Sequence, residues 1–467
     1  MPLTRRNVLT AMAAAPVLVP VLAPVGAAQA AVPQAAVPQA VLPQAEPAVW
    51  PAAATLPAGH RFDLKALPTD LLGREILLEH TRVHQQVAFD PVTGLAYAVQ
   101  LMSGGRRLPD EDPEVTLNTE DRNRRGDLCV NQLAPDGTVL AVMHLRGFGH
   151  GGGLGVEHVD GTPWLWLETD ADRVSEPVKF AYGKHIGRVA FTPGAVVDAG
   201  SSLVEVFDPV PGAAMITPSL DVDHGRIAVR HETSGVAEYR VYGLDAFKNR
   251  VFTPEHSFPA QYATQSWCLY GNLVHQNQGS AYSTTNPSPG NSWWTVYDVR
   301  TGKVVERTFN ATALDLAHRE TEAITVRRTP AGPQLVFGFA TQETRHMALY
   351  GISGTTVPWT DLVCDPAYTA TDSYSPQYRQ SGDRVDLRLR VTRVDLKPWT
   401  SGETILTLPP HLRPGRTQGM VGTATGAGTI TGPLAVRWEV TPDGRLRVYD
   451  ERGFAGWIAL DAGYFTS

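Results

Sequence analysis

The 467-residue sequence predicts an all-β protein: a five-bladed β-propeller, with six blades as the alternative, followed by a small C-terminal β-sandwich. Three observations favour this class. Short apolar segments are separated by Asp-Gly and similar turn signals, the segments between them lack a helical period, and one type of segment recurs five times. The 43 Gly and 36 Pro residues, more than an average chain contains, suit a fold rich in turns.

Residues 1–30 have the pattern of an export signal. Arg5 and Arg6 precede an apolar run that is too short to span a membrane and ends in a small-x-small motif at residues 28–30. The pattern resembles a twin-arginine signal, and an ordinary secretory signal is the alternative. We therefore expect a secreted or cell-wall-associated protein, exported by the twin-arginine pathway and without stable membrane insertion once the signal is removed.

Residues 31–59 form a linker rich in Pro, Ala and Gln, in which one Pro-Gln-Ala unit occurs three times. Regularly spaced prolines fix φ and remove backbone donors, so an extended and solvated chain is expected here. The folded body is expected to begin near His60.

Composition excludes several classes of function. The formal net charge of −7, without a basic cluster, argues against a nucleic-acid-binding protein, and a mean hydropathy of −0.15 argues against a polytopic membrane protein. Cys129, Cys268 and Cys364 lack the spacing of a zinc site or a disulfide scaffold and are expected to be separate thiols. We find no CxxCH motif or dense His/Cys cluster in the sequence, so no metal and no cofactor are expected.

Five segments predict the innermost strands of the blades. Each opens with polar residues or glycine, becomes apolar, and returns after a turn as a second strand. Their openings are 48 to 67 residues apart, which fits four-stranded blades of about 40–50 residues with loop insertions. Residues 60–353 are therefore predicted to be the propeller, with the five openings meeting at one end of its funnel. The segments are residues 84–90, 150–157, 217–222, 265–270 and 320–325.

Residues 357–467 have a different pattern. Val385, Leu387, Leu389 and Val391 alternate strictly with charged residues, which is typical of an antiparallel strand with one buried face. Similar segments follow to the end of the chain and predict the β-sandwich.

Three motifs carry a resemblance to a known family: residues 82–86 leading into Phe89-Asp90, residues 149–157 with Gly149-His150-Gly151, and residues 320–324. Residues 60–353 resemble the β-propeller shared by phage receptor-binding tail proteins and bacterial proteins called teichoic acid biosynthesis protein C. The segment with Thr407-Leu408-Pro409 and residues 411–414 is similar to sandwich domains of phage tail fibres. The resemblance implies a five-bladed propeller that engages wall teichoic acid or a related glycopolymer.

The candidate catalytic residues are His84, His150, Glu320 and Glu322. Imidazoles can exchange protons near neutral pH, and the glycines after His150 would let a ligand approach the backbone closely. Glu320 and Glu322 are two residues apart on a strand and face one side, so one carboxylate could raise the pKa of the other, bind a cation or hold sugar hydroxyls.

The candidate substrate-binding residues are polar, cationic or aromatic residues expected near the funnel. Tyr182, Lys184 and His185 would neutralise a phosphate or carboxylate, and Trp267 would stack on a sugar. The full set is Gln86, Gly152, Tyr182, Lys184, His185, Gln265, Trp267 and Arg319.

Together these features predict a secreted protein that recognises and degrades an anionic cell-wall glycopolymer, either teichoic acid or a related polysaccharide, at the propeller funnel. The reaction would be that of a lyase, a phosphodiesterase or a glycosidase. The alternative is a non-catalytic carbohydrate- or teichoic-acid-binding propeller akin to phage receptor-binding proteins. The expected partner is the glycopolymer, and no nucleic acid is expected.

Overall fold

The structure, a computed structural model, describes residues 55–56, 60–342, 344, 346–371, 374–425, 434–449 and 456–466. The predicted signal peptide and all of the predicted linker except residues 55–56 lie outside these ranges. Within them, no helix has both the length and the apolar composition needed to cross a membrane.

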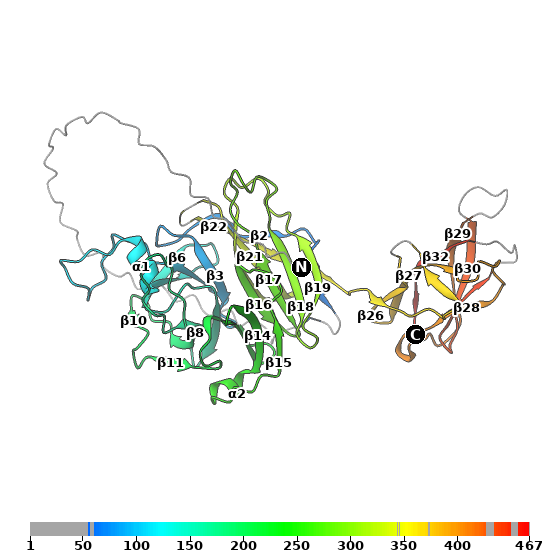
Figure 1. Cartoon of the computed structure of the whole chain (residues 1–467), viewed down its shortest axis with the longest axis horizontal. Helices are drawn as coiled ribbons and strands as arrows, with labels where there is room; N and C mark the ends of the chain where they lie inside the picture. Colours follow the sequence, from blue (N-terminus) through cyan, green and yellow to red (C-terminus); the bar gives the residue numbers. More distant parts are fainter. Residues whose placement is uncertain are drawn as a thin grey trace, which may run out of the picture. The chain divides into compact units, whose positions relative to one another are not determined.

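The predicted five-bladed propeller is confirmed. The five predicted segments are the innermost strands of five sheets; each contacts the innermost strand of the next sheet, and the last contacts the first. Figure 1 shows β16, β17 and β18 beside β14 and β15 of the preceding blade. The innermost strands are β3 (His84–Phe89), β7 (Leu154–Val159), β12 (Ala214–Asp221), β16 (Ser266–Tyr270) and β20 (Glu320–Thr329).

The first two blades are linked by a strand that the chain adds to the first blade while it is building the second. The chain leaves the second blade to form β10, which pairs in parallel with β6 of the first blade, and then returns as β11. This excursion ties the two blades together. The remaining strands of the first blade are β4 (Ala96–Leu101), β5 (Leu128–Leu133), β6 (Val139–Arg146) and β10 (Val196–Asp198), and those of the second are β8 (Thr162–Thr169), β9 (His185–Ala190) and β11 (Val204–Phe207).

The ring is closed by an N-terminal strand. β2 is the outermost strand of the fifth blade although it directly precedes β3 of the first blade in sequence, so the β2–β3 connection joins the two ends of the propeller. The third blade adds β13 (Arg226–Thr233), β14 (Val236–Gly243) and β15 (His256–Pro259), and the fourth adds β17 (Leu273–Gln278), β18 (Trp293–Asp298) and β19 (Lys303–Phe309). The fifth adds β21 (Gly332–Ala340), β22 (His346–Ile352) and β2 (Thr69–Leu77), while β1 (Arg61–Phe62) pairs with β23 (Thr355–Thr356).

Two short α-helices interrupt the strands. α1 (Thr119–Arg125) begins at Asn118, whose side chain accepts from the backbone of Asp121 in a capping box, and it ends at Gly126 in the left-handed conformation. α2 (Leu244–Lys248) follows β14. These helices lie in connections, so they do not change the all-β class that the sequence predicts.

Three innermost strands are irregular near their N-terminal ends. A β-bulge or similar register shift falls between His84 and Gln86 in β3, between Ala214 and Thr217 in β12, and within Thr321–Ile324 of β20. Bulges change the direction of side chains and are common beside functional sites. The same end of the propeller is therefore irregular in three of its five blades.

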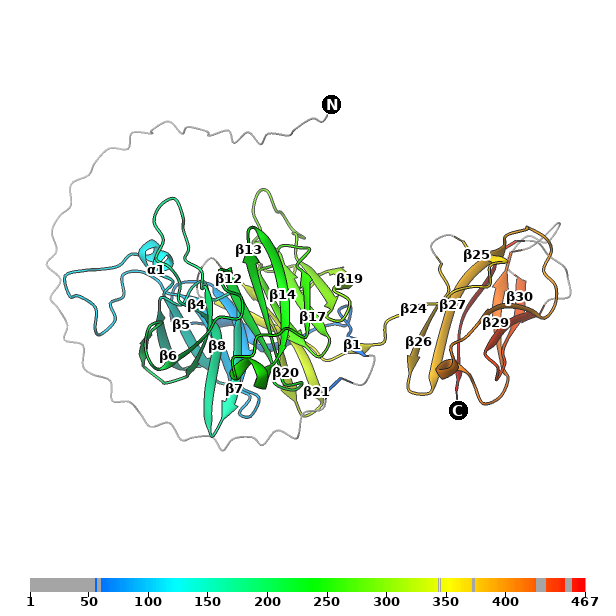
Figure 2. The ribbon, with the colours of Figure 1, turned by 60° about the horizontal axis from the view of Figure 1, so that its bottom comes forward.

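The C-terminal module is a small all-β unit, as predicted, and its strands form one curled sheet rather than two separate ones. β32 pairs with both β27 and β29 and so joins the strands into a single antiparallel sheet, which curls around its own apolar face (Figure 2). The predicted alternation in β27 is confirmed, because Val385 and Leu387 are fully buried. The strands are β24 (Thr360–Asp361), β25 (Tyr368–Ala370), β26 (Gln377–Ser381), β27 (Arg384–Arg393), β28 (Glu403–Thr407), β29 (Gln418–Ala424), β30 (Leu434–Val440), β31 (Arg445–Tyr449) and β32 (Ile458–Phe465), with a 3-10 turn at Pro410–Leu412.

Candidate functional site

A buried carboxylate organises the entrance to the second blade. Glu168 lies near the end of β8 and is fully buried. Its oxygens accept hydrogen bonds from the backbone N–H groups of Gly151 (2.6 Å), Gly152 (3.2 Å) and Gly183 (2.7 Å). Burial raises the pKa of Glu168, and these backbone donors oppose the rise. Glu168 thereby fixes the loop of His150 to the loop of Tyr182, a role that the sequence analysis did not assign to it.

Two of the glycines after His150, Gly153 and Gly155, are required for close packing between blades. A Cβ on Gly153 would lie 2.6 Å from the carbonyl oxygen of Pro218, and one on Gly155 would lie 2.5 Å from Leu220 Cβ. Both neighbours belong to β12 of the next blade. A Cβ on Gly152 would meet a methyl group of Thr217 at 3.5 Å. The small residues therefore let β7 and β12 approach each other near the propeller axis.

His150 has an aromatic and cationic environment. Its ring centroid lies 4.9 Å from that of Phe180, in an edge-on contact, and 5.0 Å from that of Tyr182. Burial, together with the charge of Arg82, lowers the pKa of His150 to about 4, so the imidazole is neutral near pH 7. Within the described residues, neither His150 Nδ1 nor Arg82 Nε has a hydrogen-bond partner, although both atoms are buried.

Glu320 and Glu322 form a carboxylate pair at the start of β20. Glu320 is partly exposed and contacts His318 Nε2 at 3.2 Å, and the charge of Glu320 also acts on Arg82. Glu322 is 4% exposed, and its pKa is raised well above the ordinary value by burial and by the charge of Glu320. A buried carboxyl beside a second one, with a raised pKa, is a feature of sites for acid–base chemistry.

His84 lies away from this cluster. Its ring is fully buried, and its Nε2 atom is 2.9 Å from the position that a Cβ on Gly338 of β21 would occupy. The side chain therefore packs between the first and fifth blades, and burial lowers its pKa to about 3. Neither ring nitrogen has a partner among the described residues. The structure does not present His84 and His150 as a pair of accessible imidazoles.

Three other predicted residues are held inside the protein. Gln86 contacts the fourth and fifth blades through the carbonyl of Trp267 (3.3 Å) and the N–H of Ile324 (3.1 Å). Trp267 is 2% exposed and donates from Nε1 to Thr217 Oγ1 (3.1 Å), so its ring has no open face. Arg319 is 1% exposed and donates to the carbonyl oxygens of residues 310 and 312. Their contacts fasten blades and loops together.

The remaining predicted residues lie at the periphery. Gln265 is exposed immediately before β16. Lys184 and His185 stand at the start of β9, the third strand of the second blade, and both pair with acidic side chains: Lys184 Nζ lies 2.9 Å from Asp172, and His185 Nδ1 lies 2.9 Å from Asp170. Both side chains therefore already have acidic partners within the blade.

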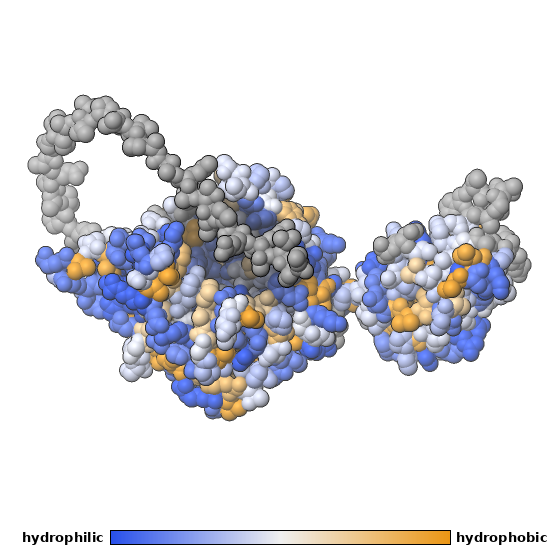
Figure 3. Space-filling view, in the orientation of Figure 1, coloured by the Kyte–Doolittle hydropathy of each residue, from blue (hydrophilic) through white to orange (hydrophobic). Residues whose placement is uncertain are grey.

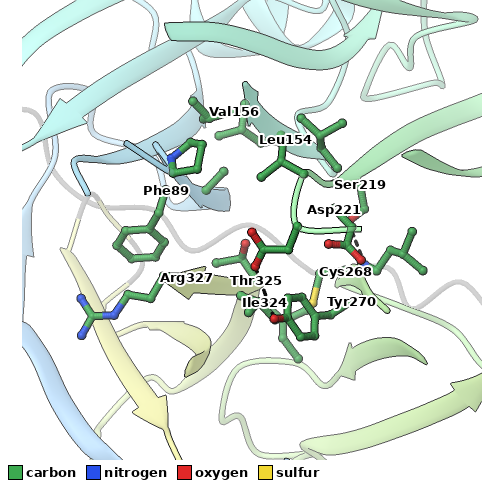
Figure 4. A pocket seen from close by; sticks show the side chains of 18 of the residues that line it. Phe89, Leu154, Val156, Ser219, Asp221, Cys268, Tyr270, Ile324, Thr325 and Arg327 are labelled. Carbon is green, nitrogen blue, oxygen red and sulfur yellow. Dashed lines mark hydrogen bonds between the residues drawn. The ribbon is translucent and has the colours of Figure 1, made fainter. Parts of the chain in front are cut away.

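The opposite part of the channel is narrow. Its lining comes from all five innermost strands (Figure 4), and it encloses about 50 Å³, which is room for very little beyond ordered water. Arg328 forms an ion pair with Asp223, which also accepts from the hydroxyl of Tyr270 (3.3 Å). These contacts narrow this end of the channel.

The candidate site is therefore the cluster formed by Arg82, His150, Tyr182, Glu320 and Glu322, with Phe180 behind His150. Arg82 was part of a motif in the sequence but was not predicted as a site residue. An arginine two residues before a strand is common, so its position in the sequence does not indicate a binding role. On the face drawn in Figure 3, apolar residues occur as separate patches among hydrophilic ones.

The comparisons with known proteins agree with the five-bladed propeller fold. Residues 83–193, which span the first two blades from β3 to β9, match the profile of the Phage 5-bladed beta propeller receptor binding platform domain. The matched residues include His150 and the loop of Tyr182.

Individual proteins are more distant. The chain is 27% identical over 168 residues to the "Putative major teichoic acid biosynthesis protein C" of Bacillus subtilis (strain 168). The aligned region covers 35% of this chain and 32% of that protein. The match thus spans about a third of the relative's length. The resemblance expected from the sequence, to phage receptor-binding propellers and to teichoic acid biosynthesis protein C, is confirmed by these two matches.

Solved structures with similar folds include the tail fiber of Staphylococcus aureus phage P68, at a TM-score of 0.44 and 13% identity, covering 84% of this chain and 96% of that chain. A glycoside hydrolase family 43 arabinoxylan arabinofuranohydrolase from Bacillus subtilis gives a TM-score of 0.30 and 10% identity, covering 85% and 99%.

Proposed function

We propose that this protein binds an anionic cell-surface glycopolymer, of the teichoic acid type or a related polysaccharide, at the cluster around Arg82 and His150. The observation that carries the proposal is the pair of unsatisfied polar atoms, Arg82 Nε and His150 Nδ1, which are buried at the strand openings. Buried polar groups are almost always paired, so buried atoms without partners among the described residues indicate that a ligand or water completes them. Arg82 and His150 are near enough for the charge of Arg82 to lower the pKa of His150.

The chemistry of the cluster fits a phosphate or carboxylate joined to a polyol or sugar. A guanidinium donates in a planar fork that matches such anions, and a neutral imidazole adds a further hydrogen bond. The rings of Phe180 and Tyr182 beside His150 provide apolar surface for a carbon skeleton. Support also comes from the receptor-binding profile that covers this region.

Binding is tested with the purified full chain and immobilised wall teichoic acid, with a neutral polysaccharide as comparison. Arg82→Gln removes the cation but keeps the polar character of the side chain, so the dissociation constant is expected to rise roughly 10- to 100-fold, the value of one charge-assisted hydrogen bond. Arg300→Gln is the matched control, because Arg300 is 62% exposed in the β18–β19 turn. Equal binding by the Arg82→Gln variant, or equal binding of the neutral polymer, would contradict the proposal.

A second candidate function is cleavage of the bound polymer, favoured by the raised pKa of Glu322 beside Glu320. Glu322 would act as the general acid and Glu320 as the second carboxyl group, as in hydrolysis by two carboxylates. Polymer incubated with the protein would then release fragments. Glu322→Gln is expected to abolish fragment release while binding is retained. If no polymer is cleaved by the unmodified protein, cleavage is refuted and the binding proposal remains.

We also propose that the protein acts outside the cell membrane, because the Arg5-Arg6 pattern is typical of export signals. Fractionation of cells that express the full chain, compared with an Arg5→Lys and Arg6→Lys double variant, tests this. Retention of the double variant inside the cell is expected, and equal export of both chains would contradict the twin-arginine route.

A further inference from the structure

Three potential metal ligands meet inside the first blade. His80 lies on the connection between β2 and β3, Cys129 on β5 and His144 on β6. One ligand atom from each residue lies within 4.8 Å of the other two, and all three residues are buried. The Nε2 atoms of His80 and His144 are 3.1 Å apart, with the rings at 81° to each other.

These separations are close to those around a tetrahedral zinc ion. With Zn–N near 2.0–2.1 Å and Zn–S near 2.3 Å, two nitrogens on one zinc are roughly 3.3 Å apart, and a nitrogen and a sulfur are roughly 3.6 Å apart. The observed nitrogen–nitrogen distance already matches. The sulfur needs to approach by about 1 Å, which is within the range of a side-chain rotation.

The charge of the surroundings permits a cation. Arg106 and Arg122 lie near the two imidazoles, but Arg106 is paired with Glu79, and Arg122 is paired with Glu111 and with Asp127. The guanidinium charges are thus compensated by carboxylates. A neutral imidazole offers one nitrogen lone pair to a metal, and the Nε2 atoms of both rings lie on the side where the rings meet.

Hydrogen bonds from neighbouring residues hold His80 in place. Its Nδ1 atom accepts a hydrogen bond from the backbone N–H of Ser103 (3.1 Å) and lies 2.9 Å from Ser103 Oγ, so the proton of the neutral ring is on Nε2 and faces His144 Nε2. Zinc binding at Nε2 requires this proton to move to Nδ1, where the hydroxyl of Ser103 can accept it in a hydrogen bond. Gln100 is fully buried and fixes the backbone on both sides: its Oε1 accepts from the N–H of His80, and its Nε2 donates to the carbonyl oxygens of His80 and Arg82.

We propose that His80, Cys129 and His144 bind a zinc ion that fastens the β2–β3 connection to the first blade. The thiol proton of Cys129 is released to solvent when zinc binds, so one proton leaves for each ion bound. Because β2 belongs to the fifth blade and β3 to the first, the ion secures the point at which the ring closes. It also fixes the loop that carries Arg82. The sequence analysis expects no metal, because residues 80, 129 and 144 lack a characteristic spacing.

Metal binding is measured on the full chain after chelator treatment. Equimolar Zn²⁺ is expected to bind at one ion per chain and to raise the temperature of unfolding. Co²⁺ serves as a spectroscopic probe, because a thiolate ligand gives a charge-transfer band that a site made only of histidines lacks. Cys129→Ser is expected to abolish that band. Cys268→Ser is the matched control, since Cys268 is a buried cysteine on β16 of another blade, and it should retain the band.

Two further variants keep the test decisive if Cys129→Ser does not fold. Ser103→Ala removes only the hydroxyl beside His80 and is expected to weaken zinc binding roughly 10- to 100-fold. His144→Gln should prevent stoichiometric binding while circular dichroism still reports a β-sheet protein. The proposal is overturned if the unmodified chain binds no zinc at equimolar concentration, if it takes up copper but not zinc, or if Cys129→Ser keeps the cobalt band.

Discussion

Removal of Glu168 should disrupt the candidate site without touching the residues that face a ligand. Glu168→Ala deletes the acceptor for three backbone N–H groups, at 2.6, 2.7 and 3.2 Å. A buried donor left unpaired costs about 1–3 kcal/mol. Part of this loss is offset, because the buried carboxylate is itself unfavourable, as its raised pKa indicates. We therefore expect the free energy of unfolding to fall by about 3 kcal/mol.

Hydrogen exchange provides the local assay, and urea unfolding provides the global one. In the Glu168→Ala variant, exchange should accelerate in peptides that cover residues 149–153 and 181–185, because their amides lose the shared acceptor. Polymer binding should also weaken, since the contact between His150 and Tyr182 depends on the two loops. Glu205→Ala is the control in the same blade: Glu205 is 46% exposed and pairs with Arg188, so a change within about 0.5 kcal/mol is expected. Unchanged stability and exchange in Glu168→Ala would refute the role of Glu168.

Three other substitutions test separate parts of the argument. Glu322→Gln should stabilise the protein at neutral pH. Because the pKa of Glu322 is raised in the folded state, the free energy of unfolding falls as pH rises above about 4.5, so the urea midpoint between pH 4 and 8 should depend less on pH in the variant. A destabilised variant would contradict an unfavourable buried charge at Glu322. Gly153→Ala places a Cβ 2.6 Å from a carbonyl oxygen of β12 and should lower the free energy of unfolding by about 1–3 kcal/mol, measured with urea. Gly200→Ala is the control, because a Cβ on Gly200 meets open space and should leave stability unchanged. Equal effects of the two substitutions would argue against close packing between β7 and β12. Leu387→Ala removes a fully buried side chain from the C-terminal sheet and should lower the free energy of unfolding by about 2–5 kcal/mol. Amide hydrogen exchange should become faster in β26, β27 and β32, and unchanged exchange would show that the curled sheet does not rely on this core.

The propeller could be predicted because the sequence patterns of its strands and turns involve residues that are close together in the chain. Each blade needs apolar strands of a certain length joined by tight turns, and turns such as Asp136-Gly137 require the left-handed conformation that glycine adopts readily. The five openings were therefore visible as recurring segments. The start of β7 was placed four residues early, at residue 150 rather than 154, because the glycines before it resemble a strand opening but form a loop held by Glu168.

The candidate site was predicted only in part. His150, Tyr182, Glu320 and Glu322 lie at the strand openings as expected. His84 and Trp267 do not offer their rings there, because bulges and blade packing turn these side chains into the protein. A strand pattern gives the alternation of side chains, but a single bulge reverses which face they occupy.

The amino-acid sequence by itself determined the strands, the turns and the half-buried face of β27, since each depends on residues that are neighbours in the chain. The choice of five blades over six came from the structure. The tertiary structure decided which distant groups meet, such as Glu168 with three backbone amides and His80 with Cys129 and His144, and it decided that Glu322 is buried while Glu320 is partly exposed. Such contacts depend on how the sheets pack and on what burial does to charge, because a carboxylate or imidazole acquires its pKa and its partners only when other blades exclude water from it.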